Sequence, residues 1–209
     1  ALWPIVLVII AAVFTYNLCV RTGAMDVIGS MITSISSDRR LLALLVAWCF
    51  GGFMEGMAGF GTAVAIPAGM LAGLGFEAVP DVLICLLANG VPTPYGSIGI
   101  PTVSVADLVG LDSLHLATVQ LVQLAPFFVV MPLLIVLVAG RVADDQGNVA
   151  SVGERLRGVA GIALLSGASF VGAALVVAMF VGPELAVVVG SIVSLALTAA
   201  LAMRAEKSG

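Results

Sequence analysis

Two stretches rich in glycine and proline interrupt long apolar segments and place polar groups among side chains suited to lipid. The first, 55-EGMAGFGTAVAIP-67, contains a carboxylate, and the second, 89-NGVPTPYGSIGIP-101, contains an amide and several hydroxyls. Each is thirteen residues long and ends in Ile-Pro. That likeness is compatible with chance in so glycine-rich a chain, and equally with two related helix breaks that meet at one site.

Glu55 is the acid that lies well inside an apolar region. Insertion scales put an Asp, Lys or Arg at a helix centre at roughly 2.5 to 3.5 kcal/mol, so an intramembrane carboxylate is a functional candidate. A carboxyl group removed from water takes up a proton more readily, and we interpret Glu55 as a proton-coupling residue. The structural alternative is that it caps a half-helix starting near Met57 by accepting from its free amides.

The remaining groups of the two stretches favour a small organic anion as ligand. Glycines free backbone N–H groups at the start of a half-helix, and such an end carries roughly half a positive charge. Packing of helices is the alternative role for glycine, and we expect it at Gly52 and Gly69. The candidate substrate-binding residues are Gly59, Phe60, Gly61, Thr62, Asn89, Thr93, Tyr95, Gly96 and Ser97.

Other kinds of site are not predicted, and neither a metal nor a cofactor is expected. The 59-GFGTAV-64 segment matches neither the phosphate-loop nor the dinucleotide-binding pattern. The eight Lys and Arg lie at segment ends, which disfavours nucleic acid as a partner. Cys19, Cys49 and Cys85 lie in apolar runs and are interpreted as small buried side chains. An intramembrane hydrolase is disfavoured because the single histidine, His115, is expected at a membrane edge and not at the depth of the two stretches, so the protein is not expected to be an enzyme.

Membrane helices are the elements that must position these residues. The 209-residue chain is 61% hydrophobic and 10% charged, whereas a soluble domain carries about 25% charged residues. A helix that crosses the hydrocarbon core, about 30 Å thick, needs roughly 20 apolar residues. Four runs meet this requirement: 1–20, 115–139, 158–181 and 185–203.

The middle of the chain is built from shorter pieces. The apolar run 41–53 would be about 20 Å long as a helix, which is too short to span. We therefore predict a re-entrant helical hairpin over 41–76, with its tip at 56–61, and a broken crossing helix over 80–110; the reverse assignment stays open. The expected fold is an all-α polytopic membrane protein, a single transmembrane domain over 1–209 with about five crossing helices.

The distribution of charge predicts the orientation. Basic residues occur in 21–40, 141–157 and 204–207, while 77–112 and 182–184 carry acids alone. By the positive-inside rule, the loops 21–40 and 141–157 are cytoplasmic. His115, beside an external loop, is expected at the surface, and Gln120 and Gln123 are expected to face the interior and to bond to the broken segments.

These residues resemble the L-lactate permease family. The similar stretches are 2-LWPIVLVIIAAVFTYNLCVRTGAMDVI-28, 51-GGFMEGMAGFGTAVAI-66, 71-LAGLGF-76, 96-GSIGIP-101, 182-GPEL-185 and 191-SIVSL-195. The segment around Glu55 is the most specific of them. The resemblance implies a secondary transporter that carries lactate or glycolate together with protons across the bacterial inner membrane, with its sites at the broken segments.

Two differences from the family limit what the resemblance implies. Family members read approximately N-T-A-P-V-A-F-G-A-x-G-I-P at the second stretch, whereas this chain has an added Pro94 and the polar Thr93, Tyr95 and Ser97; a different or larger carboxylate therefore stays open. Members are also considerably longer. We expect this chain to be an interior portion of the N-terminal half, to need a related C-terminal half, and not to function alone. A homo-oligomer, a facilitative anion channel and a structural membrane subunit stay open as alternatives.

Overall fold

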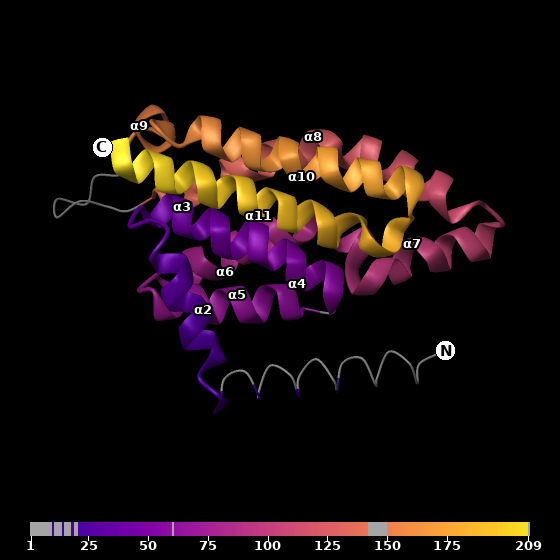
Figure 1. Cartoon of the computed structure of the whole chain (residues 1–209), viewed down its shortest axis with the longest axis horizontal. Helices are drawn as coiled ribbons and strands as arrows, with labels where there is room; N and C mark the ends of the chain where they lie inside the picture. Colours follow the sequence, from indigo (N-terminus) through magenta and orange to yellow (C-terminus); the bar gives the residue numbers. More distant parts are fainter. Residues whose placement is uncertain are drawn as a thin grey trace.

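The computed structural model describes residues 21–59, 61–141 and 150–208, together with Ile10, Phe14 and Leu18. The described residues form helices and no strands, and most of the helices run along the long axis of the molecule (Figure 1). The expected span 1–20, apart from those three residues, lies outside the described part of the chain, as does Cys19. The all-α membrane fold expected from the sequence is confirmed.

Three long helices form one side of the molecule (Figure 1). They are α8 (Ser113–Ala139), α10 (Ala160–Phe180) and α11 (Pro183–Ser208). Each is long and apolar enough to cross a membrane, which confirms the spans expected at 115–139, 158–181 and 185–203. Glycines let them approach closely: a Cβ on Gly167 would lie 2.8 Å from the Val129 Cα of α8, and one on Gly190 would lie 2.9 Å from the Phe170 carbonyl oxygen of α10.

A helical hairpin lies beside these three helices. Its first limb runs without a break through α3 (Arg39–Ala43), the π-helix η1 (Leu44–Phe50) and α4 (Gly51–Met57), and the return limb is α5 (Thr62–Gly73). The two ends of the hairpin meet, because Arg39 Nη2 donates a hydrogen bond of 3.1 Å to the Gly75 carbonyl oxygen. A helical hairpin is therefore present over 41–76, as predicted, while its re-entrant course stays a prediction, because the first limb is itself long enough to span.

The first limb is longer than predicted from the apolar run 41–53. It has 19 residues, about 28 Å as helix, because Glu55 stays helical and the break begins only at Ala58. The return limb has 12 residues, about 18 Å, which is too short to cross the hydrocarbon core. Gly52 packs against Phe170, as expected. Gly69 is exposed, so the packing expected there is not made with the described residues.

The π-helical segment of the first limb carries the largest side chain of the core. Trp48 is 1% exposed, and its ring lies 5.9 Å from the Phe128 ring of α8 and 5.2 Å from the Phe170 ring of α10. Edge-on and tilted contacts of this kind stabilise packing beyond the area they bury. This aromatic cluster fixes the hairpin against the long helices.

A broken helix is present where one was predicted over 80–110, and its crossing of the membrane stays a prediction. It consists of α6 (Ala78–Gly90), the short 3₁₀ turn η2 (Thr93–Tyr95) and α7 (Gly96–Val109). The two helical parts are bent by 63° relative to each other. Counted as one span, the pair raises the number of candidate crossings among the described residues from four to five.

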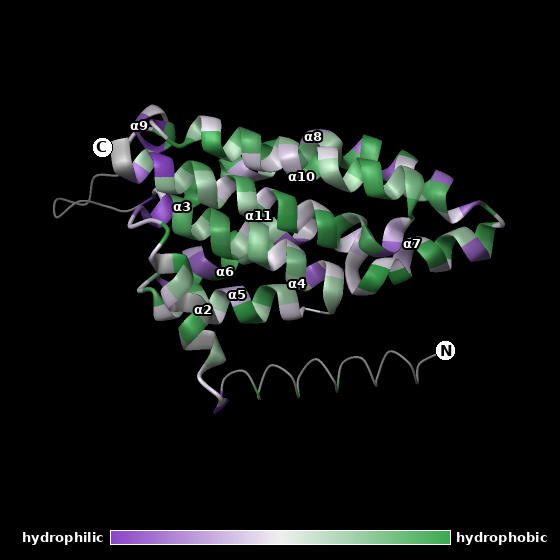
Figure 2. Cartoon of the chain, viewed as in Figure 1, coloured by the Kyte–Doolittle hydropathy of each residue, from purple (hydrophilic) through white to green (hydrophobic). Residues whose placement is uncertain are grey.

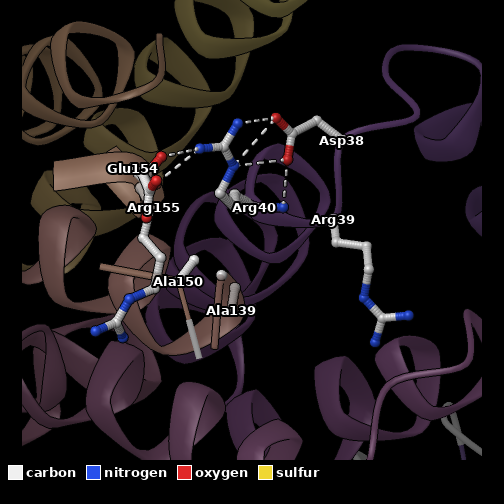
Figure 3. A pocket seen from close by; sticks show the side chains of 8 residues that line it. Asp38, Arg39, Arg40, Ala139, Ala150, Glu154 and Arg155 are labelled. Carbon is white, nitrogen blue, oxygen red and sulfur yellow. Dashed lines mark hydrogen bonds and ion pairs between the residues drawn. The ribbon is translucent and has the colours of Figure 1, made fainter. Parts of the chain in front are cut away.

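Polar residues gather at the two ends of the molecule, while its middle is apolar (Figure 2). The end that contains α3, α9 (Val152–Leu156) and the C-terminus also holds a cavity of about 310 Å³ lined by arginines (Figure 3). Arg40 pairs with Asp38 at 2.6 Å and donates a hydrogen bond of 2.7 Å to the Arg155 carbonyl oxygen. Arg40 thus links the start of the hairpin to α9. The remaining helix, α2 (Ala24–Thr33), precedes the hairpin at this end (Figure 1).

Candidate functional site

The two glycine-rich breaks lie in direct contact. Ser97 Oγ in the second break donates a hydrogen bond of 2.7 Å to the Ala58 carbonyl oxygen in the first. Gly59 lies so close to Ser97 that a Cβ at position 59 would approach the Ser97 nitrogen to 2.9 Å. The expectation that the breaks meet at one site is therefore confirmed.

The first break is a short turn between antiparallel helices. Gly59 has φ +56° and Gly61 has φ +86°, a left-handed conformation that glycine adopts at little cost. Gly61 precedes α5, whose first turn has no capping side chain at the N-cap position. Thr62 Oγ1 donates a hydrogen bond of 2.7 Å to the Gly59 carbonyl oxygen, which stabilises the turn. Phe60 lies outside the described residues.

The second break contains a left-handed turn. Ser97, Ile98 and Gly99 have φ values of 49°, 59° and 71°. The left-handed helix costs roughly 1–2 kcal/mol for each residue with a side chain, and a β-branched residue such as Ile98 is an outlier there. Such a conformation persists only where its surroundings hold it. Gly99 supplies part of that support, because a Cβ on it would lie 2.8 Å from the Pro183 carbonyl carbon at the start of α11.

Glu55 lies in the last turns of α4, where its side chain faces the second break. The residue is 3% exposed, and its Oε1 lies so close to Gly96 that a Cβ there would clash with it. Its Oε2 is buried and has no hydrogen-bond partner among the described residues. The capping alternative is wrong, because α4 ends at Met57 and the next helix begins at Thr62. An ionised carboxylate in this position is costly without a donor, so a proton or a ligand's polar group would satisfy it.

Three further residues of the second stretch are predicted to bind substrate, and the surroundings of their polar groups differ from one to the next. Asn89 Oδ1 is buried and has no hydrogen-bond partner among the described residues. Thr93 is exposed and its hydroxyl donates a bond of 2.7 Å to the Asn89 carbonyl oxygen. Tyr95 is fully buried, and its hydroxyl donates a bond of 2.5 Å to the Ala117 carbonyl oxygen of α8. The hydroxyls of Thr93 and Tyr95 are thus engaged by the backbone.

Of the two glutamines expected to face the interior, one does so. Gln120 Oε1 lies 2.8 Å from the hydroxyl of Thr102, a residue of the broken helix, which confirms that this glutamine bonds to the broken segment. Gln123 is exposed, so its expected inward position is wrong: three residues along an α-helix turn a side chain by 300°, and position 123 faces outward on α8. His115 is exposed, as expected.

One buried acid is not predicted from the sequence. Asp81, in the first turns of α6, is 2% exposed. The Cys85 thiol, 3.7 Å from Asp81 Oδ1, is its hydrogen-bond partner. The available signal was spacing, because Asp81, Cys85 and Asn89 recur every four residues and share one face of a helix.

An apolar cavity of about 350 Å³ lies next to the second break, between α6 and α8. Its lining includes Gly90, Val91, Leu124, Phe127 and Met131. Carbon-lined walls offer a small anion no hydrogen bond, so this cavity is a poor place for one. The polar groups and helix ends of the two breaks are the better candidate site for an anion.

The chain is similar to a well-defined set of transport proteins. Residues 1–207 match the profile of the L-lactate permease family. The L-lactate permease of Streptococcus iniae is 42% identical over 197 residues, 94% of this chain and 39% of that protein. The L-lactate permease of Escherichia coli (strain K12) is 38% identical over 194 residues, and the glycolate permease GlcA of the same strain 35% over 194 residues; each alignment covers 93% of this chain and 33% of the relative.

This chain spans between a third and two-fifths of the length of those relatives. No solved structure matches it significantly.

Proposed function

Because the chain belongs to the L-lactate permease family, we propose that it is part of a secondary transporter that carries a small monocarboxylate of the lactate or glycolate kind together with protons. The printed names of its relatives support that substrate class. The observation that carries the proposal is the buried Glu55, whose Oε2 has no hydrogen-bond partner among the described residues, beside two helix breaks that touch. A transporter has a use for such a costly group, whereas a purely structural subunit has none.

Glu55 is the proton-coupling residue in this proposal. Its carboxyl group lies against Gly96, so a proton gained or lost there changes the charge next to the second break. A bound carboxylate would be repelled by an ionised Glu55 and tolerated by a protonated one. Binding of the anion and uptake of the proton would therefore favour each other.

The substrate is held at the breaks by backbone amides and by a few side chains. We assign this role to the first-break residues 59–62, Phe60 among them, and to Asn89, Gly96 and Ser97 of the second stretch. The start of α5, which lacks a capping side chain, supplies partial positive charge for a carboxylate. Tyr95 and Thr93 support the shape of the break, because their hydroxyls already bond to backbone carbonyls.

The orientation and the assembly are part of the same proposal. Arginines at the end that contains α3 and α9 favour placing that end, with the loops 21–40 and 141–157, in the cytoplasm of a bacterial cell. The remainder of a longer polypeptide, related to this portion, would complete the transporter, within the lipid of the inner membrane.

Transport by the full-length protein in membrane vesicles tests the proposal. Uptake of labelled lactate and of labelled glycolate is measured with and without an imposed proton gradient, for the natural protein, Glu55→Gln and the exposed control Glu77→Gln. We expect the gradient to drive accumulation in the natural protein and in Glu77→Gln. We expect Glu55→Gln to lose accumulation at least about tenfold, because a glutamine cannot exchange a proton, while exchange of labelled for unlabelled substrate continues.

Two results would overturn the proposal. Uptake that ignores the gradient and is unchanged in Glu55→Gln would identify a facilitative anion channel. Absence of any substrate-specific uptake by a correctly inserted protein would favour a structural subunit.

A further inference from the structure

One buried face of α6 carries a line of polar side chains that the proposed function leaves unexplained. Asp81, Cys85 and Asn89 are spaced by four residues, so they lie on one side of the helix. Asp81 and Cys85 are buried, and Asn89 Oδ1 is buried as well. The opposite side of α6 is apolar and exposed at Val82, Leu83 and Leu86. The polar line therefore faces the protein, not the lipid.

The start of α6 favours a carboxylate at Asp81, but the surrounding side chains do little to hold it in the ionised state. The one hydrogen bond found for it within the described residues comes from the Cys85 thiol, at 3.7 Å, and a thiol is a weak donor. Arg39, which contacts the residues just before α6, is engaged there: it donates to the Gly75 carbonyl oxygen and lies 4.3 Å above the centre of the Phe76 ring. A buried carboxyl group without an ion-pair partner is a functional candidate in a membrane helix.

The elements packed against α6 bring few titratable groups toward it. They are α5, α8, η1 and α4. The described residues of α5 have none, and α8 has His115, which is exposed. The π-helix η1 has Cys49, whose sulfur lies 3.5 Å from Ser194 Oγ and 3.7 Å from Ser166 Oγ on the side of α10 and α11. The remaining one is Glu55 of α4.

The two buried acids lie at opposite ends of this polar line. Asp81 is in the first turns of α6, at the end of the molecule that contains Arg39 and the hairpin ends. Asn89 is in the last turn, about 12 Å further along the helix. The chain then enters the second break, where Gly96 touches Glu55. The amide oxygen of Asn89, which has no hydrogen-bond partner among the described residues, therefore lies between Asp81 and the second break.

We propose that Asp81 is a second proton-carrying residue, which passes protons between the arginine-rich end of the molecule and Glu55 along the buried face of α6. Asp81 takes a proton from water at that end and releases it to water molecules held along the line, and Asn89 Oδ1 accepts a hydrogen bond from the last of them. The proton then reaches the carboxylate of Glu55. Only O–H bonds are made and broken in this transfer. Asp81 loses the proton and becomes negatively charged, and Glu55 gains the proton and becomes neutral.

The inference rests on the proposed role of Glu55, and its test separates the two. The full-length protein and the variants Asp81→Asn, Asp81→Glu and Glu77→Gln are inserted into vesicles at equal amounts. Glu77 is the matched control, because it is an exposed acid at the same end of α6. Two rates are measured for labelled lactate: accumulation driven by a proton gradient across a range of external pH, and exchange of labelled for unlabelled lactate at equal pH on both sides.

We expect Asp81→Asn to slow gradient-driven accumulation at least about tenfold and to flatten its dependence on external pH, while exchange at equal pH stays within about twofold of the natural protein. Asp81→Glu should restore both the rate and the pH profile, and Glu77→Gln should match the natural protein. A purely structural role for Asp81 would lower exchange and accumulation together and would leave the shape of the pH profile unchanged.

Three outcomes would overturn the inference. Asp81→Asn could match the natural protein in both rates while Glu55→Gln loses accumulation, which would leave the proposed function intact. Exchange and accumulation could fall equally. Finally, Asp81→Asn and a second neutral variant, Asp81→Ser, could both fail to insert while Asp81→Glu inserts and transports, which would mark a structural need for the carboxylate. Accumulation that persists in Glu55→Gln would instead overturn the proposed function.

Discussion

Ser97 and Ala58, 39 residues apart in the chain, are joined by a hydrogen bond of 2.7 Å from the serine hydroxyl to the alanine carbonyl oxygen. Ala58 directly follows the last residue of α4, and Ser97 begins the left-handed turn of the second break. Irregular backbone inside a membrane needs partners within the protein. This bond provides one, and it fixes the position of each break relative to the other.

Replacement of Ser97 by alanine should weaken the contact between the breaks. The Ala58 carbonyl oxygen loses its donor, at a cost of about 1 kcal/mol for a typical hydrogen bond. We expect the KM for lactate to rise about fivefold in vesicle uptake, because the substrate groups on both breaks lose their alignment. The matched control is Ser169→Ala, since the Ser169 hydroxyl bonds only to the Ser166 carbonyl oxygen of its own helix. Equal effects of the two variants would contradict a special role for Ser97.

A methyl group at position 96 should displace the carboxyl group of Glu55. Gly96 has φ −61°, which suits alanine, so the effect of Gly96→Ala is steric and not conformational. The new Cβ would collide with Glu55 Oε1 and lie 3.1 Å from Glu55 Cδ. Overpacking of this kind costs typically 1–3 kcal/mol, and we expect gradient-driven uptake to fall about tenfold or more.

Gly73→Ala is the control for that substitution. A Cβ on Gly73 meets nothing within 4 Å of the described residues, and alanine favours helix at this position of α5. Uptake by Gly73→Ala should match the natural protein. Normal uptake by Gly96→Ala would show that the Glu55 carboxyl group can move without loss of function.

The left-handed turn makes Ile98 and Ile100 a matched pair for a stability measurement. Both are partly exposed isoleucines, but Ile98 has φ +59° whereas Ile100 is not among the residues with positive φ. Ile98→Gly relieves the left-handed strain and should be neutral or stabilising by up to about 1 kcal/mol. Ile100→Gly should destabilise by about 1 kcal/mol, as glycine does in a helix interior. Thermal unfolding of the purified protein in detergent compares the two, and a larger loss in Ile98→Gly would contradict the strain.

The sequence predicts where helices are interrupted better than it predicts which groups the interruptions expose. The two breaks are visible because glycine and proline stand inside apolar runs, and irregular backbone at that depth must face protein. The sequence predicts that the first limb of the hairpin ends directly after Glu55, because a carboxylate disfavours a membrane helix. In the structure, α4 continues through Glu55 to Met57. Local sequence carries no information on that tertiary burial.

Two side chains show the same limit. Tyr95 reads as a polar group available to a ligand, but the fold brings Ala117 of α8 to its hydroxyl, and that partner is 22 residues away. Nothing in the residues adjacent to Asp81 predicts its burial, yet the packing of α6 buries it. In both cases the burial and the hydrogen bonding of the side chain depend on which helix, distant in sequence, packs against it.

The last prediction concerns the arginine-rich end and its dependence on pH. Asp38 caps α3 by accepting from the Arg40 amide at 2.8 Å, and it pairs with the Arg40 guanidinium. Burial alone would raise the pKa of the Asp38 carboxyl, but the hydrogen bonds from the Arg40 side chain and amide, together with the Arg40 charge, hold it below its usual 3.8. A carboxylate whose pKa is lower in the folded state stabilises the fold above its unfolded pKa, and that contribution disappears as the pH falls through the folded value.

Asp38→Asn should therefore lower the Tm of the full-length protein in detergent at pH 7 and at pH 5 by an equal, small amount. Asparagine still caps the helix, so the loss is that of a partly exposed ion pair, at most about 1 kcal/mol. The difference from the natural protein should begin to shrink below about pH 3.8, where Asp38 of the unfolded chain takes up a proton, and should disappear as the pH falls through the lower pKa of the folded state, where the folded Asp38 becomes neutral as well. Asp107→Asn, an exposed acid on α7, serves as the control and should show no such convergence. A difference that persists unchanged at low pH would mean that the asparagine acts through packing and not through the charge of Asp38.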